Sequence, residues 1–197
     1  MNLGILFSGG KDSSYALYKA SEENEIKVLI TLDSENKDSY MFHTPVEKAE
    51  EQASKLEIPL LKIRTEGKKE EELEDLKIAI KKAIDEYEIE GVVTGAVAST
   101  YQASRVQRIC DDLDIYCFNP LWQKDQVELL REITSKIKVK IVKVAAEGLD
   151  ESWVGKIIDN NVVKELIKLK EKYGINVAGE GGEYETEVEE FYDCSST

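Results

Sequence analysis

Residues 3–13 read LGILFSGGKDS, an apolar run that ends in two adjacent glycines and a polar Lys-Asp-Ser segment. The apolar run predicts a buried β-strand, and the polar segment predicts the start of a helix that Asp12 or Ser13 caps. Gly9 and Gly10 let the backbone turn sharply and bring its N–H groups close to a ligand. Because a helix N-terminus has unpaired N–H donors and roughly half a positive charge, this stretch predicts a binding site for a phosphate chain.

The spacing within this loop differs from the Walker A pattern of NTPases that cleave the γ-phosphate. That pattern has a Ser or Thr directly after its lysine, whereas Asp12 follows Lys11 here. SGGKDS instead resembles the pyrophosphate loop of the N-type ATP pyrophosphatases, which split ATP between its α and β phosphates. The alternative is an ordinary strand–turn–helix corner, because Gly-Gly and Asp-Ser are also common in turns and caps.

Strand and helix patterns alternate over the first 118 residues. Apolar runs predict strands at 3–7, 26–32, 59–63, 91–95 and 115–118, and amphipathic patterns predict helices at 12–22, 46–56, 70–87 and 101–113. This alternation is typical of an α/β fold with a doubly wound, parallel five-stranded sheet. Ligands of such sheets bind beyond the carboxyl ends of the strands, where the strand order reverses. The loops after the first, second and fourth strands are therefore the expected functional segments.

The alternation weakens after Asn119-Pro120-Leu121-Trp122. We expect an ATP-binding domain over residues 1–120 and a smaller α+β domain over 121–197, with helices at 124–136 and 162–172 and a strand at 136–144. Lysines alternate with Ile and Val in this strand, which predicts one solvated face. Residues 179–186 read GEGGEYET, and we expect an acidic turn there because the segment is too rich in glycine and glutamate for a buried strand.

The composition favours a cytoplasmic globular protein. No apolar run approaches the roughly 20 residues that span a bilayer, and Met1 leads directly into the first strand without a signal-peptide pattern. Forty acidic against 26 basic residues give a net charge of −14, which repels polyanions and disfavours nucleic acid as a partner. The three cysteines lack C-x-x-C spacing and His43 is the only histidine, so neither a zinc site nor a disulfide framework is indicated.

Two loops beyond the first contain candidate ligand contacts. After the second strand, Met41 and Phe42 could clasp a purine ring or could merely seal the edge of the sheet. After the fourth strand, Gly95 precedes a helix on which Tyr101 and Arg105 lie one turn apart on the same face. Arg105 could direct its guanidinium at a phosphate, or it could pair with a surface carboxylate.

The acidic segment near the C-terminus is a third candidate. Glu180, Glu183 and Glu185 lie within six residues, and their mutual repulsion would be offset by Mg²⁺ or by a positively charged substrate. The alternative is a solvated acidic hairpin, since acidic residues are plentiful throughout the chain.

Five segments in this order, SGGKDS, SYMFHT, TGAVASTYQASRV, NPLW and GEGGEYET, resemble the diphthine–ammonia ligase family of adenosine-nucleotide α-hydrolase-like proteins. The resemblance implies ATP-dependent amidation of diphthine, a modified histidine with a trimethylammonium group on the translocating elongation factor. Ammonium would be the nitrogen donor, an adenylated carboxylate the intermediate, and AMP and pyrophosphate the products. The sequence departs from this pattern at Val97-Ala98, where relatives often have Ile and an acidic or polar residue.

The resemblance also implies roles for individual residues, with ATP and Mg²⁺ as the expected cofactors. The catalytic residues would be Lys11, Asp12, Arg105 and Glu183, with Asp12 also a candidate Mg²⁺ ligand. ATP would contact Ser8, Gly9, Gly10, Lys11, Asp12, Ser13, Leu32, Met41, His43, Gly95, Tyr101 and Gln102. The protein substrate would contact Trp153, Glu180, Gly181, Gly182, Glu183, Tyr184, Glu185 and Thr186, where carboxylates and aromatic rings suit a permanent cation.

Two other functions remain open at the level of sequence, as does a homo-oligomeric assembly. One is a tRNA-modifying ATP pyrophosphatase, which the negative charge and the absence of paired catalytic cysteines disfavour. The other is a nucleotide-binding sensor module without catalysis, which would need neither the SGGKDS loop nor the acidic segment.

Overall fold

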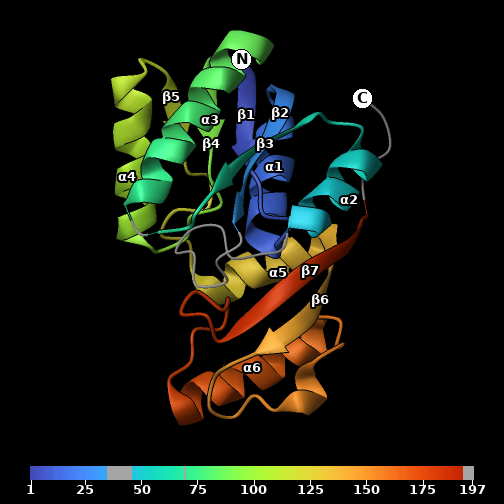
Figure 1. Ribbon diagram of the computed structural model, residues 1–197. Coiled ribbons are helices and arrows are strands. Elements are labelled where there is room, and N and C mark those ends of the chain that lie inside the picture. Colours follow the sequence, from blue (N-terminus) through green and yellow to red (C-terminus); the bar gives the residue numbers. More distant parts are fainter. Residues whose placement is uncertain (35–45, 69, 193–197) are drawn as a thin grey trace.

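Five parallel strands form the main sheet, in the order β3-β2-β1-β4-β5 (Figure 1). The computed structural model describes residues 1–34, 46–68 and 70–192. The strands are β1 (Asn2–Leu6), β2 (Glu25–Ser34), β3 (Leu60–Thr65), β4 (Gly91–Val93) and β5 (Tyr116–Phe118). The chain moves outward from β1 to β3 and then crosses to β4 on the other side of β1. The strand order therefore reverses between β1 and β4, where a ligand site is expected.

Helices cover both faces of this sheet, as the doubly wound pattern predicts. Helices α1 (Lys11–Ser21) and α2 (Val46–Leu56) pack on one face, and α3 (Glu71–Tyr87) and α4 (Thr100–Asp112) pack on the other. A hydrophobic core lies on each face of the sheet, the first under α1 and α2 and the second under α3 and α4. Strand β1 contributes side chains to both cores because its side chains alternate: Leu3 and Ile5 belong to the first core and Leu6 to the second. The predicted α/β fold with a parallel five-stranded sheet is thus confirmed.

The C-terminal part packs against the first core. It contains α5 (Gln126–Lys136), β6 (Ile137–Val144), the short 3₁₀ helix η1 (Glu151–Trp153), α6 (Asn160–Tyr173) and β7 (Tyr184–Phe191), with β6 and β7 paired antiparallel. Helix α5 lies between this two-stranded sheet and the main sheet (Figure 1). Its Leu129, Leu130 and Ile133 are fully buried in the same core as Tyr15 of α1, so the two parts of the chain share one core. A domain boundary at residue 120 stays a prediction.

The expectation of an acidic turn over 179–186 was wrong from Tyr184 onward, because strand β7 begins there. Tyr184 and Val188 are buried, which anchors the strand to the core. Its glutamates face the lysines of β6: Lys143 Nζ lies 2.7 Å from Glu185 Oε1, and Lys140 Nζ lies 2.5 Å from Glu189 Oε1. Cross-strand pairing thus offsets the charge that argued against a strand.

The predicted cap of the first helix was also wrong. Helix α1 begins at Lys11, one residue earlier than expected, and Gly10 occupies the N-cap position without a side chain to cap it. Asp12 and Ser13 lie inside the first turn. The N-cap residue of α1 therefore lacks the side-chain oxygen that usually accepts from the first N–H groups of a helix.

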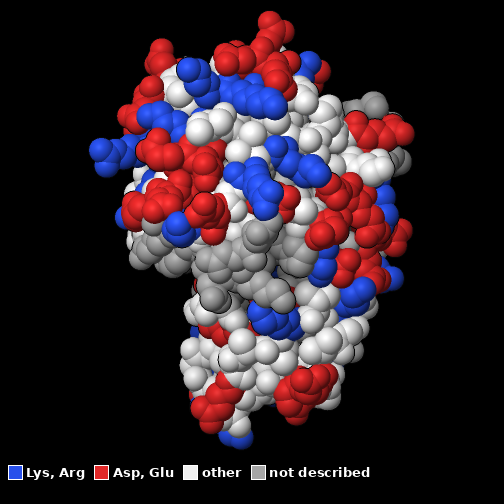
Figure 2. Space-filling view, viewed as in Figure 1, with Lys and Arg blue, Asp and Glu red and all other residues white. Residues whose placement is uncertain are grey.

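The surface carries both signs of charge. Lysine and arginine side chains are interspersed with the more numerous carboxylates on the face seen in Figure 2. Within the described ranges, no helix is long and apolar enough to cross a membrane.

Candidate active site

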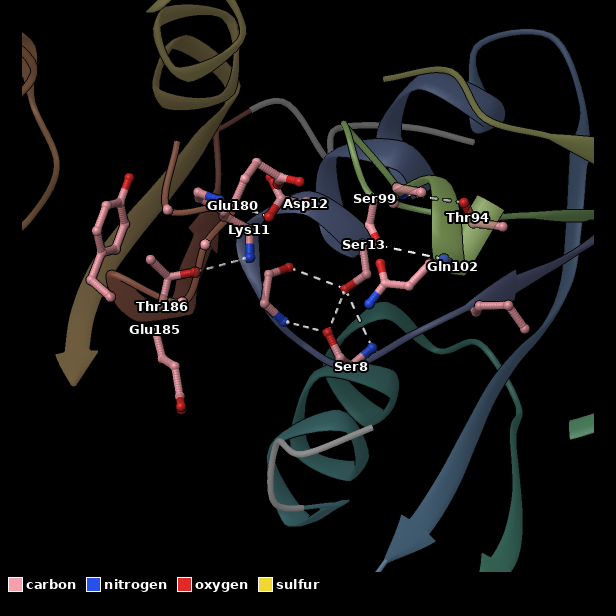
Figure 3. A pocket seen from close by; sticks show the side chains of 18 of the residues that line it. Ser8, Lys11, Asp12, Ser13, Thr94, Ser99, Gln102, Glu180, Glu185 and Thr186 are labelled. Carbon is pink, nitrogen blue, oxygen red and sulfur yellow. Dashed lines mark hydrogen bonds and ion pairs between the residues drawn. The ribbon is translucent and has the colours of Figure 1, made fainter. Parts of the chain in front are cut away.

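A pocket of about 470 Å³ lies at the carboxyl ends of β1 and β4, where the strand order reverses. Three segments line it: the loop after β1, the loop after β4 with the start of α4, and residues 179–186 (Figure 3). The lining residues are Leu6, Ser8, Gly10, Lys11, Asp12, Ser13, Thr94, Gly95, Ala96, Ser99, Gln102, Val106, Gly179, Glu180, Gly181, Gly182, Tyr184, Glu185 and Thr186. The topology thus brings the sequence-predicted SGGKDS and GEGGEYET segments to one cavity.

Hydrogen bonds within the loop after β1 fix its shape. The backbone N–H of Ser8 donates to Ser13 Oγ at 3.3 Å, and Ser13 Oγ donates to the Gly10 carbonyl at 3.2 Å. Gly9 has a φ of +77°, the left-handed conformation that glycine adopts without strain. Buried Gln52 of α2 donates from Nε2 to the Gly9 carbonyl at 2.9 Å. These hydrogen bonds therefore fix the conformation of the loop that leads into the N-terminus of α1.

Gly95 allows the two loops to touch. An ideal Cβ built on Gly95 would lie 2.8 Å from the Ser13 backbone nitrogen and 2.9 Å from the Asp12 carbonyl carbon. These contacts are with main-chain atoms of α1, which cannot rotate aside as the end of a side chain can. The close approach of the β4 loop to the first turn of α1 therefore requires glycine at position 95.

Two charged side chains lie at the start of α1. Lys11 is only 4% exposed, and its Nζ lies 2.6 Å from Asp12 Oδ2 and 5.8 Å from the centre of the Tyr184 ring. The other carboxylate oxygen, Asp12 Oδ1, is buried and has no hydrogen-bond partner within the described part of the chain. A buried acceptor without a donor is costly. The pocket thus contains an acceptor that a bound ligand could satisfy.

Residues 179–186 close the pocket from the C-terminal part. Thr186 Oγ1 accepts a hydrogen bond from the backbone N–H of Lys11 at 3.2 Å, so β7 directly contacts the loop of residues 8–13. The Tyr184 hydroxyl donates to the Val177 carbonyl at 2.6 Å. Burial, together with nearby carboxylates, raises the pKa of Tyr184 well above its ordinary value, so this side chain stays a neutral donor.

The three glutamates of this segment have separate surroundings. Glu183 accepts from the backbone N–H groups of Asn176 and Gly181 at 2.9 and 2.7 Å and from Asn176 Nδ2 at 2.7 Å. Burial acts to raise the pKa of Glu183, but these hydrogen bonds outweigh it and lower the pKa. Glu185 pairs with Lys143, whereas Glu180 lines the pocket and accepts from the Ala98 N–H at 3.3 Å.

These three carboxylates therefore do not gather around a single Mg²⁺, and a positively charged substrate at this segment stays a prediction. Within the described residues, no group of three or more His, Cys, Asp or Glu side chains could hold a metal ion. Glu183 points back into its own loop, where N–H donors satisfy it, and Glu185 is neutralised from the neighbouring strand. The role of Asp12 as a Mg²⁺ ligand stays a prediction, and its own carboxylate is the one protein ligand that this prediction names.

Several predicted contacts lie away from the pocket. Arg105 Nη2 pairs with Glu70 Oε1 at 2.8 Å and its guanidinium stacks on Tyr101, whose hydroxyl donates to the same carboxylate at 2.9 Å. Leu32 is buried inside β2. Trp153 is buried in the C-terminal part of the first core, where Lys156 Nζ lies 4.1 Å from the centre of its ring.

Some predicted site residues therefore do not contact the pocket. The structure does not bring Trp153 to the pocket as a ring face for the substrate, since its ring packs in the core. Gly9 does not line the pocket, and its carbonyl accepts from Gln52. Glu183 does not line it either, because it accepts from the backbone of Gly181 within its own segment. Met41 and His43 lie outside the described residues.

Sequence reasoning missed some of the lining. Leu6, Thr94, Ala96 and Val106 contribute to the pocket, and so does Ser99, which is also the N-cap of α4. Gln52 was also missed, although a signal was available. It lies beside Ala49 and Ala53 on the apolar stripe of α2, and a polar side chain on such a stripe usually has a buried partner.

Two family models match consecutive ranges of this chain. The model described as "Diphthamide synthase N-terminal domain" matches residues 1–116, and that described as "Diphthamide synthase C-terminal domain" matches residues 125–190. The chain belongs to the diphthamide synthase family. Among curated members, the mouse protein named "Diphthine--ammonia ligase" is 38% identical over 94% of this chain and 78% of its own length, and the human protein of the same name is 37% identical over the same shares.

A solved structure supports the fold assignment for this diphthamide synthase family member. It is titled as a predicted subunit of tRNA methyltransferase from Methanocaldococcus jannaschii DSM, with a TM-score of 0.53 and 19% sequence identity over 98% of this chain and 99% of that one. At this level of identity the likeness concerns the fold alone.

Proposed function

We propose that this protein is an ATP-dependent ligase that amidates diphthine on the translocating elongation factor, with ammonium as the nitrogen donor. The observation that carries the proposal is the shared pocket, in which the SGGKDS loop faces residues of the GEGGEYET segment. The relatives named diphthine–ammonia ligase support the same reaction class. The nucleic-acid-modifying alternative has less support, because the net charge of −14 repels tRNA.

The pocket residues fit the phosphates of ATP. The N-terminus of α1 offers a positive dipole end and N–H donors, of which that of Lys11 is bonded to Thr186, and buried Lys11 adds a full positive charge beside it. The unpartnered Asp12 Oδ1 is an acceptor for a donor that arrives with the ligand. Mg²⁺ that accompanies ATP would take most of its ligands from phosphate oxygens and water. We place the phosphates between residues 8–13 and Gly95.

The chemistry requires the pocket to hold two substrates close together. A carboxylate is a poor electrophile, and the transfer of AMP to it creates a leaving group that ammonia can displace. Lys11 and the N–H groups of α1 would stabilise charge on the phosphates during this transfer. AMP and pyrophosphate are then the expected products.

Residues 179–186 are the proposed contact for diphthine. Glu180, Glu185 and Tyr184 line the pocket, and carboxylates and rings attract a quaternary ammonium, although Lys143 already pairs with Glu185. The elongation factor as partner, the cytoplasmic location and a homo-oligomer all stay predictions. Arg105, in its contact with Glu70, would have to change partners to reach a phosphate.

A product assay tests this function. The protein is incubated with ATP, ammonium and elongation factor that carries diphthine, and the nucleotide products and the modified residue are measured. We expect AMP, pyrophosphate and a diphthamide residue in equal amounts. AMP formed only when tRNA is added would favour the tRNA-modifying function, and ATP binding without any turnover would favour a sensor.

A further inference from the structure

The amidation proposed above needs a proton acceptor, because ammonium has no lone pair until it loses a proton. We propose, on the basis of that function, that Glu180 accepts a proton from ammonium bound in the pocket and so delivers ammonia to the adenylated carboxylate. Glu180 would then be a catalytic residue rather than a contact for the quaternary ammonium of diphthine.

The pairing of the other pocket carboxylates singles out Glu180. Asp12 forms an ion pair with Lys11 at 2.6 Å through Oδ2, although its Oδ1 has no partner, and Glu185 forms an ion pair with Lys143 at 2.7 Å. Within the described part of the chain Glu180 makes no ion pair, and the oxygen that accepts the hydrogen bond from the Ala98 N–H is Oε2. Its other oxygen, Oε1, is therefore available to a ligand. Figure 3 shows Glu180 beside Lys11 and Asp12 at the pocket.

The charges around Glu180 suit a proton acceptor that works near neutral pH. Burial is the largest influence and the negative charge of Asp12 the next, and together they raise the pKa of Glu180 to about 7. Glu183 acts in the same direction, whereas Lys11 and the hydrogen bond from Ala98 oppose it. The neighbouring Tyr184 is neutral. A base is most effective when its pKa lies near the working pH.

The position of Glu180 also fits the path of the reaction. It faces the same pocket as Lys11 and the start of α1, where the α-phosphate of an adenylate would lie. Glu180 is half-buried rather than fully enclosed, so it can exchange protons with water.

The proposed step conserves protons and electron pairs. Ammonium transfers one proton to the Glu180 carboxylate, and the lone pair left on nitrogen forms the C–N bond with the carbonyl carbon of the adenylate. Glu180 passes that proton to water and is again able to accept one. The bond between the carbonyl carbon and the AMP oxygen then breaks, AMP leaves with that electron pair, and nitrogen loses its second proton to water. The products are the amide, AMP and two protons.

The variant Glu180→Gln tests this step. A glutamine has nearly the same shape and its carbonyl oxygen can still accept from Ala98, but it cannot take a proton at neutral pH. The half-reactions are separated by two assays with elongation factor that carries diphthine: exchange of labelled pyrophosphate into ATP, which reports adenylation, and amide formation. Hydroxylamine replaces ammonium in a parallel reaction, because it is largely uncharged at neutral pH and needs no base to become a nucleophile. Glu189→Gln, which removes an exposed carboxylate of β7, is the matched control.

We expect Glu180→Gln to exchange pyrophosphate within about threefold of the wild type, to amidate with ammonium about 10²-fold more slowly, and to recover most of its rate with hydroxylamine. The control should match the wild type in all three assays. Unchanged amidation with ammonium, or an equal loss with ammonium and hydroxylamine, would overturn the role of Glu180 while leaving the ligase function in place. A wild-type protein that neither exchanges pyrophosphate nor forms the amide would overturn the proposed function itself.

Discussion

The substitution Gly95→Ala probes whether the loops after β1 and β4 must touch for ATP to bind. The new Cβ would lie 2.8 Å from the Ser13 nitrogen and 2.9 Å from the Asp12 carbonyl carbon, so the first turn of α1 has to move. Overpacking of this kind costs about 1–3 kcal/mol. If the displaced N–H groups bind the phosphates, the affinity for ATP should fall by roughly 5-fold to 150-fold, since each 1.4 kcal/mol is a factor of about ten.

The assay for this variant is an ATP titration combined with urea unfolding. Gly4→Ala is the matched control, because its Cβ would crowd side-chain methyl groups of Ile30 and Ile89 at 3.0 Å inside the core, away from the pocket. We expect Gly4→Ala to lower the free energy of unfolding without changing the affinity for ATP. If folded Gly95→Ala bound ATP as tightly as the wild type, the placement of the phosphates between these loops would be wrong.

Three further outcomes are expected. Tyr184→Phe removes the buried hydrogen bond to the Val177 carbonyl and should lower the free energy of unfolding by about 1–3 kcal/mol, measured with urea. Glu183→Gln weakens the N–H contacts that hold the loop at Gly181, so amidation should fall about tenfold while an ATP titration changes little; an equal loss of ATP binding would contradict this. The pKa of Glu180 is raised on folding, so its contribution to stability is present below its unfolded value and is lost as pH rises to about 7. The stability of the wild type relative to Glu180→Gln should therefore decline between pH 5 and pH 7.5 in urea unfolding, and a constant difference would exclude the raised pKa.

The main sheet could be predicted from the sequence because its signals are local. Short β-branched runs alternate with amphipathic helices, and the glycines after β1 mark the turn into α1. The pocket could be placed for the same reason, since a reversal of strand order brings the ends of β1 and β4 together whatever their side chains are.

The partners of individual side chains could not be predicted in this way. Arg105 was a candidate for phosphate, but Glu70, which lies 35 residues away in sequence, is its partner. Glu183 looked like a free carboxylate until the fold brought the backbone N–H of Asn176 to it. Strand β7 was missed because its glutamates disfavour a strand when they are considered alone, whereas the lysines of β6 neutralise them after pairing. Such contacts depend on tertiary structure rather than on local pattern.

The hydrogen bond from the Lys11 N–H to Thr186 joins residues 175 positions apart, and this has a consequence for the protein during its synthesis. A nascent chain that extends only to Phe118 already contains all five parallel strands and the SGGKDS loop. This nascent chain lacks the side of the pocket that residues 179–186 form, because the ribosome has not yet added these residues. We therefore expect a growing chain to consume ATP only after β7 has docked against the loop.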